Sequence, residues 1–337
     1  MLIMISFLKL IRWKNLLLIA LSQFLVKYAL IEPFGLVDFT LNNFTFGLLL
    51  TATLLIAAAG NIINDLFDIE TDVINKPTRV IIGKKISEKL AFIMYIAFTS
   101  IGVILGFYVS NLINQNALSA MFVIVSVLLY LYAIQLKRTI LIGNIVVSIL
   151  VAFSLLIIGL FELLPAITSQ NQATQLTFFY IIIDYALFAF LINLLREIIK
   201  DIQDINGDCK AKMTTLPIAI GIDRTLKIVF FISCLPIMAL IYYIVIYLYN
   251  YSLAVGYFLL FLLLSTVFTV FTVLPFLLFY RFYFFSFFTV LPFLLFYCFY
   301  CFTVFTVFTS LPILPILPFL QFLLFILTSP FFPFKVM

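Results

Sequence analysis

The amino-acid sequence predicts an all-α protein, a polytopic membrane bundle of eight to nine transmembrane helices. Hydrophobic residues make up 66% of its 337 positions and charged residues only 10%. So few charges do not cover a water-soluble surface. Apolar runs of about 20 residues follow one another along the chain, and each is long enough to cross a bilayer as a helix. The basic residues gather in alternate connections between these runs.

The predicted helices are uninterrupted apolar runs that polar connections separate. Charged side chains set the boundaries, because a charge is costly at the centre of a bilayer. The first run follows Lys9, Arg12 and Lys14, and the second and sixth runs each lead into an acidic stretch. In chain order the predicted spans are 16–31, 47–66, 90–111, 117–135, 139–161, 177–196, 226–247 and 252–280.

The distribution of basic residues predicts how the chain is oriented. Most of the 19 lysines and arginines lie in the N-terminal segment and in the connections after the second, fourth and sixth spans. The connections near 32–46, 112–116, 162–176 and 248–251 hold none. By the positive-inside rule, the N-terminus and the long polar loops face the cytoplasm of a multi-pass protein in the cell (inner) membrane. Topology thus accounts for the net charge of +5, and we expect the lipid bilayer, no nucleic acid and no obligate protein as partner.

The C-terminal segment differs in composition from the rest of the chain. The ten residues Phe-Thr-Val-Leu-Pro-Phe-Leu-Leu-Phe-Tyr occur at 271–280 and again at 288–297. Such copying is typical of low-complexity sequence. We therefore divide the chain into an intramembrane domain, 1–280, and a hydrophobic tail, 281–337, interpreted as frameshifted or degenerate. An ordinary pair of lipid-facing helices is the alternative.

Two acidic clusters share one spacing. Each holds three aspartates at positions i, i+3 and i+7, and each follows a predicted membrane helix. On a helix this spacing places the carboxylates on one face over two turns, where they repel one another unless a cation offsets their charge. The first cluster is Asp65, Asp68 and Asp72, and the second is Asp201, Asp204 and Asp208.

The chemistry of these clusters favours Mg²⁺. The chain has no histidine, and carboxylates without His or Cys suit a hard ion that completes its shell with water and substrate phosphate. Arg79, Arg196 and Lys200 flank the acids and would hold the remaining phosphate oxygens. Asn193, four residues before Glu197, is expected to line the same site. The substrate predicted is a diphosphate with a lipid tail. The alternative is a pair of solvated loops whose acids merely pair with lysines, which the identical spacing disfavours.

At these residues the sequence resembles the UbiA-type intramembrane prenyltransferases. The family's first motif, Asn-Asp-x-x-Asp-x-x-x-Asp followed by Asn-x-Pro-x-Arg, matches Asn64 to Asp72 and Asn75 to Arg79. The second motif matches Asp201 to Asp208. The resemblance covers about residues 9–250. It implies helices around a central cavity, with the two Asp motifs facing each other under a cytoplasmic cap.

The resemblance also implies an activity for the domain 1–280. A polyprenyl diphosphate would be bridged by two Mg²⁺ ions, and its prenyl group would pass to a membrane-soluble acceptor. Arg79 and Lys200 would contact the diphosphate, and Asn64 would contribute to substrate binding. The residues that the resemblance assigns to the metals, with the aspartates as the catalytic set, are Asn61, Asp65, Asp68, Asp72, Asp201, Asp204 and Asp208.

Within the family, the second cluster is most similar to the branch that prenylates geranylgeranylglycerol phosphate. The alternatives are prenyl transfer to an aromatic acceptor in quinone biosynthesis, a divalent-cation transporter and an inactive remnant. A transporter predicts acids at mid-membrane, whereas these acids lie at helix ends beside basic loops. The tail is the feature that favours a remnant.

Overall fold

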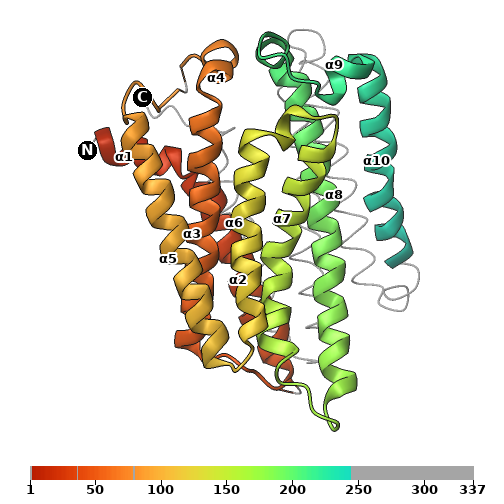
Figure 1. Cartoon of the computed structure of the whole chain (residues 1–337). Coiled ribbons are helices and arrows are strands. Elements are labelled where there is room, and N and C mark those ends of the chain that lie inside the picture. The colour runs from red at the N-terminus through yellow and green to blue at the C-terminus, as the bar shows by residue number, and fades with distance from the viewer. Residues whose placement is uncertain (1, 36, 79, 244–337) are drawn as a thin grey trace, which may run out of the picture. The chain divides into compact units, whose positions relative to one another are not determined.

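The chain folds into helices joined by short connections, as Figure 1 shows. The computed structural model describes residues 2–35, 37–78 and 80–243. In these ranges the ordered elements are helical, and one isolated bridge pairs Ile82 with Ile86 in a loop. The all-α prediction is therefore confirmed. The α-helices are α1 (Leu2–Leu10), α2 (Trp13–Leu25), α3 (Asn43–Phe67), α4 (Ile69–Asn75), α5 (Glu88–Leu112), α6 (Ser119–Ile134), α7 (Ile142–Ile158), α8 (Gln172–Lys210), α9 (Leu216–Ile220) and α10 (Ile222–Tyr243).

Six helices of the described ranges are long and apolar enough to cross a membrane. They span Trp13–Ile31, Asn43–Phe67, Glu88–Leu112, Asn116–Ile134, Ile142–Leu163 and Gln172–Lys210. Each overlaps one of the first six predicted spans. Only part of the predicted span 226–247 is described, in α10. The span 252–280, the tail 281–337 and Arg79 lie outside the described residues, so the total of eight to nine helices stays a prediction.

Short-range capping explains where two of these helices begin. The side chain of Asn42 accepts a hydrogen bond from the Thr45 amide at 2.9 Å, at the start of α3. Ser87 caps α5 in the same way, accepting from the Leu90 amide at 3.3 Å. A side-chain oxygen at this position satisfies a backbone N–H that has no partner within the helix. Both caps follow a polar connection, which is why the sequence predicts these starts to within a few residues.

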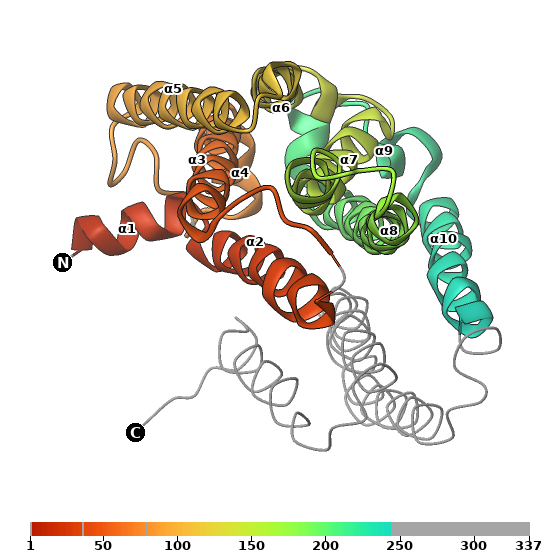
Figure 2. The same cartoon turned by 90° about the horizontal axis from the view of Figure 1, so that it is seen from below.

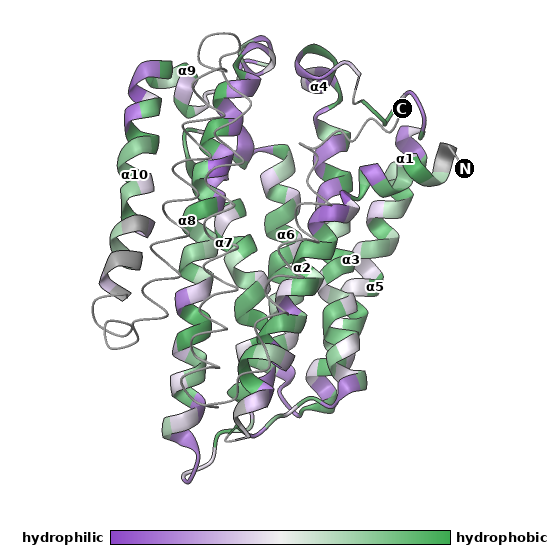
Figure 3. Cartoon of the chain, turned by 180° about the vertical axis from the view of Figure 1, so that it is seen from behind, coloured by the Kyte–Doolittle hydropathy of each residue, from purple (hydrophilic) through white to green (hydrophobic). Residues whose placement is uncertain are grey.

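The chain divides into two compact units, 1–229 and 230–337, and the helices of the first unit determine where the polar residues lie. Within it, α3 packs beside α5 and α7 beside α8, as the view in Figure 2 shows. A glycine permits one close approach: a Cβ on Gly106 of α5 would lie 2.3 Å from the ring of Phe122 on α6. Figure 3 shows that hydrophilic residues gather at α4 and the neighbouring ends of α3 and α8.

At the other end of these helices lies a buried ion pair. α2 continues into a π-helical turn, Val26–Ile31, and α7 into another, Gly159–Leu163. Lys27 of the first turn pairs with Glu162 of the second, and their side chains are 5% and 0% exposed. The ends of α2 and α7 lie opposite α4 in Figure 1. The unit thus holds charged side chains at both ends of its apolar helices.

Candidate active site

The first acidic cluster lies where α3 gives way to α4. α3 ends at Phe67, Asp68 has non-helical backbone angles (φ −99°, ψ 6°), and α4 begins at Ile69. The three aspartates of this cluster therefore do not lie on one uninterrupted helix. Asp68 accepts a hydrogen bond from the Thr71 hydroxyl through its carbonyl oxygen, at 2.9 Å. Asp and Thr often form such local bonds, which compete with the regular helix. The chain still turns in a helical sense, because the Asp72 amide donates to the Asp68 carbonyl at 2.8 Å.

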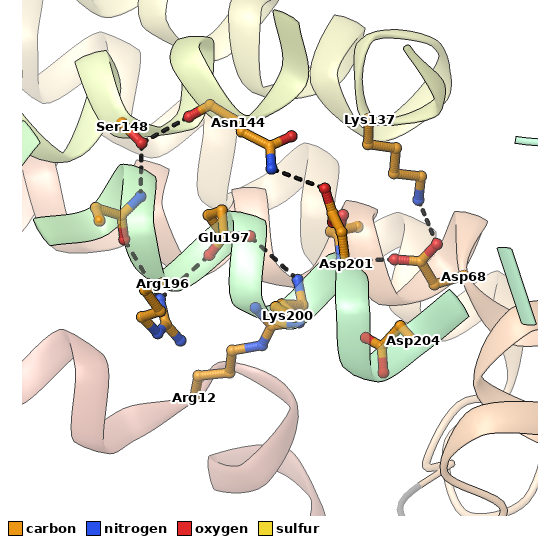
Figure 4. Close-up of polar contacts among 12 residues, drawn as sticks. Arg12, Asp68, Lys137, Asn144, Ser148, Arg196, Glu197, Lys200, Asp201 and Asp204 are labelled. Carbon is orange, nitrogen blue, oxygen red and sulfur yellow. Dashed lines mark hydrogen bonds and ion pairs between the residues drawn. The ribbon is translucent and has the colours of Figure 1, made fainter. Parts of the chain in front are cut away.

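The second cluster does lie on one continuous helix. α8 runs without a break to Lys210, so Asp201, Asp204 and Asp208 share a face of it. The side chain of Asn144, near the start of α7, donates to the Asp201 carboxylate at 2.8 Å (Figure 4). Asp208 is buried, with 8% of its surface exposed. α7 and α8 thus position the second cluster together.

The structure brings the two clusters together although they are far apart in the chain. The side-chain amide of Asn75, the last residue of α4, donates to the Asp204 carbonyl at 2.9 Å and accepts from the Gly207 amide at 2.8 Å. Lys76 forms an ion pair with the Asp204 carboxylate at 2.6 Å. α4 therefore lies directly against α8, and the acids of both helices share one end of the unit.

Cations from other segments neutralise carboxylates of both clusters. Arg12 pairs with Asp65 at 2.6 Å. Lys137, in the connection before α7, pairs with Asp68 at 2.5 Å, as Figure 4 shows. Together with the Lys76–Asp204 pair, these contacts give three of the cluster aspartates a cationic partner each. The site is therefore a mixed arrangement of acids and bases rather than a purely acidic one.

The predicted phosphate-binding cations of α8 lie beside these pairs. Arg196 and Lys200 both contact Glu197, at 3.3 and 3.4 Å. The Asn193 side chain accepts from Arg196 at 3.4 Å and donates to the Ser148 hydroxyl at 3.3 Å. Arg12 is close enough to Lys200 for their charges to interact. α8 thus carries a row of polar side chains that leads to Asp201.

Two asparagines that the motif included have local structural partners. The Asn61 side chain donates to the Ile11 carbonyl at 3.0 Å, which ties the N-terminal segment to α3. The Asn64 side chain donates to the Asp68 carboxylate at 2.8 Å. The amide oxygen of Asn64 is buried and has no hydrogen-bond partner in the described structure. An orphaned buried oxygen beside a carboxylate is available to a cation.

Crowding of like charges shows in the behaviour of Asp72. Burial raises the pKa of its carboxyl above the ordinary value, and the neighbouring Asp68 and Asp65 carboxylates raise it further. Like charges disfavour the ionised form of each other, whereas a nearby cation favours it. The first cluster therefore gains stability from any divalent ion that binds beside it.

The donor set fits Mg²⁺. Within the described ranges, no three Asp, Glu, Cys or His side chains converge as a metal cage. Mg²⁺ seldom needs such a cage, because it usually takes one or two protein carboxylates and keeps water and substrate phosphate as its other ligands. Paired carboxylates and the free amide oxygen of Asn64 are hard oxygen donors of the required kind.

Sequence reasoning gave no site role to Lys76, Asn75, Lys137 or Asn144. Lys137 counted as a basic residue of a connection and, with Asn144, as a lesser match to the family pattern, and Asn75 counted as part of a motif. Their contacts join segments that are distant in the chain, and no local pattern encodes such contacts. The available signal was proximity to the clusters: Asn75 and Lys76 follow the first cluster directly.

Several known proteins are similar to this chain. A model of the UbiA prenyltransferase family matches residues 20–273. Digeranylgeranylglyceryl phosphate synthase of Methanopyrus kandleri is 39% identical over 173 residues, which are 51% of this chain and 57% of that protein. The synthase of Saccharolobus solfataricus is 40% identical over 184 residues, 54% of this chain and 60% of that protein. The matched part of the chain thus spans less than two thirds of the length of these relatives.

A solved structure concerned with digeranylgeranylglyceryl phosphate synthase in membranes has a similar fold. It superimposes with a TM-score of 0.50 at 25% sequence identity, over 80% of this chain and 88% of that one. The family model covers most of the chain, from the middle of the first membrane-length helix onward. With its several membrane-length helices the protein is a multi-pass membrane protein, and it belongs to the UbiA prenyltransferase family.

Proposed function

We propose that this protein is a Mg²⁺-dependent prenyltransferase that transfers a geranylgeranyl group from its diphosphate to geranylgeranylglycerol phosphate. One observation carries the proposal: acids from two distant segments meet at one end of a membrane helix bundle, interleaved with cations. Family membership supports the reaction type, and the name that the relatives share supports the lipid acceptor.

The carboxylates act as the metal-holding part of the site. Asp65, Asp68 and Asp72 approach from the α3–α4 side, and Asp201, Asp204 and Asp208 from α8. Asn61 and Asn64 add amide oxygens beside the first cluster. Bound Mg²⁺ would neutralise the diphosphate and stabilise it as a leaving group.

The cations act on the diphosphate itself. Lys76 and Lys137 each hold a cluster carboxylate, and a lysine can turn to a phosphate oxygen when a metal ion takes over that carboxylate. Arg196 and Lys200 approach from α8, and Arg79 is assigned the same role from the motif. Guanidinium and ammonium groups then stabilise the charge that develops on the leaving diphosphate.

The acceptor completes the reaction. Its hydroxyl oxygen bonds to the prenyl carbon as the carbon–oxygen bond to the diphosphate breaks. Because the chain has no histidine, the hydroxyl proton passes to a carboxylate or to the released diphosphate. Both lipid tails stay in the bilayer, so the reacting groups meet at its surface. The basic connections predict that this surface is the cytoplasmic face of the cell membrane.

The test is product analysis with the full chain in membranes. Labelled geranylgeranyl diphosphate is supplied with geranylgeranylglycerol phosphate or with an aromatic acceptor, in Mg²⁺ or in EDTA. We expect an ether-lipid product in Mg²⁺ only. Asp68→Ala and Asp204→Ala should abolish it without loss of the protein from the membrane. Glu70→Ala, an exposed acid of α4 outside the spacing, is the matched control and should keep full activity.

Each part of the proposal has its own contrary result. Product formed in EDTA would overturn the metal requirement. Product from the aromatic acceptor alone would overturn the lipid acceptor. If folded protein makes no product from either acceptor in Mg²⁺, the protein is an inactive remnant.

A further inference from the structure

One residue between the clusters has no part in the proposed chemistry and yet joins the two helices that carry it. Asn75 uses both polar atoms of its side chain on the backbone of α8. Its nitrogen donates to the Asp204 carbonyl at 2.9 Å, and its oxygen accepts from the Gly207 amide at 2.8 Å. Both partners lie within the second cluster, one at Asp204 itself and one directly before Asp208.

Gly207 makes this contact possible. A Cβ at this position would lie 2.4–2.7 Å from three atoms of the Asn75 side chain. Such distances are too short for any real Cβ, so a side chain here would push Asn75 away. A glycine inside a helix costs about 1 kcal/mol relative to alanine. The place of Gly207 within α8 is therefore explained by the room that it leaves for Asn75.

The contact opposes a repulsion. α4 has only seven residues, too few to be stable alone, so its position depends on tertiary contacts. It carries Asp72 beside Asp68. The Asp204 carboxylate of α8 repels Asp72, and the Asp208 carboxylate repels Asp68. Like charges at this range push the two segments apart. The Asn75 amide and the adjacent Lys76–Asp204 ion pair hold the two segments together.

We propose that Asn75 is a positioning residue whose amide, seated on Gly207, sets the separation of the two carboxylate clusters and so their affinity for divalent metal. This role rests on the proposed function, in which both clusters hold Mg²⁺. Both polar atoms of the Asn75 side chain bond to the backbone of α8, so Asn75 is not counted among the metal or substrate ligands. It acts through the position of Asp204, which it holds by the backbone carbonyl while Lys76 holds the carboxylate.

The direct test is metal binding by the purified full chain, measured by titration with Mn²⁺ and electron paramagnetic resonance in the absence of substrate. Removing a residue that orients metal ligands typically lowers metal affinity by about 10–100-fold. We expect Asn75→Ala to weaken Mn²⁺ binding by about that factor, equivalent to roughly 1.4 kcal/mol per tenfold. The Mg²⁺ concentration for half-maximal prenyl transfer should rise in parallel, with activity recovering at high Mg²⁺.

A second variant and a double variant sharpen the test. Gly207→Ala should also weaken metal binding, because the added methyl group displaces the Asn75 side chain. In the Asn75→Ala background the same methyl meets no amide, so the double variant should bind metal no more weakly than Asn75→Ala. Such non-additivity is expected of residues in direct contact. A merely structural loss would instead lower the yield of folded protein at unchanged metal affinity.

Two matched controls lie elsewhere in the chain. Asn111→Ala removes an exposed asparagine near the end of α5. Gly47→Ala adds a methyl group in α3 where nothing lies within 4 Å of the new Cβ. Both should keep native Mn²⁺ affinity and a native Mg²⁺ midpoint.

The outcomes separate this inference from the proposed function. Unchanged Mn²⁺ affinity and Mg²⁺ midpoint in folded Asn75→Ala and Gly207→Ala would overturn the role of Asn75, whatever the reaction. If Asn75→Ala fails to fold, Gly207→Ala decides alone. Native protein that binds Mn²⁺, loses affinity in both variants and yet makes no prenylated product would support the positioning role and overturn the function. Native protein that neither binds Mn²⁺ nor makes prenylated product in Mg²⁺ would overturn both.

Discussion

Ion pairs join distant segments at both ends of the first unit, but their surroundings differ. At the acidic end the side chains of the Arg12–Asp65 pair are 35% and 21% exposed, and those of Lys76–Asp204 are 30% and 14% exposed. At the opposite end, the side chains of Lys27 and Glu162 are 5% and 0% exposed. The Lys137–Asp68 pair lies between these extremes, at 9% and 19% exposed. Water and solutes therefore reach the Arg12–Asp65 and Lys76–Asp204 pairs, but not the Lys27–Glu162 pair.

The buried pair also has its polar atoms satisfied. Lys27 donates to the Leu41 carbonyl at 2.8 Å as well as to Glu162. The second carboxylate oxygen of Glu162 accepts from the Leu41 amide at 3.0 Å, and the Glu162 carbonyl accepts from the Thr40 hydroxyl at 3.0 Å. These bonds join the connection before α3 to the ends of α2 and α7. Because the pair is buried and fully hydrogen-bonded, neither charge can exchange its partner for a ligand.

The two kinds of ion pair differ in how much they contribute to stability. Exposed ion pairs contribute about 0–1 kcal/mol, since water competes for both charges. Removing one partner of a buried pair costs about 3–5 kcal/mol, because the other charge is left unpaired. We infer that the Lys27–Glu162 pair holds helices in place, whereas the partly exposed Arg12–Asp65 and Lys76–Asp204 pairs can give way to a ligand at a lower cost.

The largest expected effect breaks the buried pair. Lys27→Met should lower the free energy of unfolding by about 3–5 kcal/mol, because Glu162 is left as an unpaired buried charge. The measurement is unfolding of the purified protein in detergent micelles by added denaturing detergent. The double variant Lys27→Met/Glu162→Leu serves as the control and should regain most of the loss. A cost below that of an exposed pair would contradict the distinction between the two ends.

A smaller effect on stability is expected when Mg²⁺ binds at the acidic end. A ligand that binds only the folded state stabilises it by about 2.7 kcal/mol at 100 times its dissociation constant. Mg²⁺ should therefore raise the melting temperature of the native protein, and EDTA should reverse the rise. Asp68→Asn should show a much smaller rise, whereas the exposed Glu70→Gln should respond like the native protein. An equal response of Asp68→Asn would place the ion elsewhere.

The smallest effect on stability is expected for the partly exposed Lys76–Asp204 pair. Lys76→Met should change the free energy of unfolding by no more than about 1 kcal/mol, since the pair it removes is partly exposed. The change should shrink further as salt is added, because salt screens exposed charges more strongly than buried ones. Lys27→Met, measured in the same salt series, should keep its full cost. A salt-independent loss for Lys76→Met would show that its pair behaves as buried.

Much of the fold follows from local sequence. The first six predicted spans overlap the six membrane-length helices, because hydropathy over about 20 residues reports directly on burial in lipid. The all-α class and the family resemblance are also confirmed, the latter by the family model over residues 20–273. The first cluster differs: the spacing predicted one helix, and the helix breaks at Asp68. There Asp68 has non-helical backbone angles and accepts a local hydrogen bond from the Thr71 hydroxyl, a kind of bond that competes with the regular helix.

The sequence by itself determined which residues are apolar, where the helices cross the membrane and which carboxylates share a spacing, since each of these properties depends on neighbours in the chain. Only the tertiary structure decided which cation meets which carboxylate: Lys76 with Asp204, Lys137 with Asp68, and Lys27 with Glu162. The seat of Asn75 on Gly207 was decided in the same way. Such contacts arise from the packing of whole helices, and a pairing between residues 69 to 135 positions apart leaves no periodic trace in the sequence.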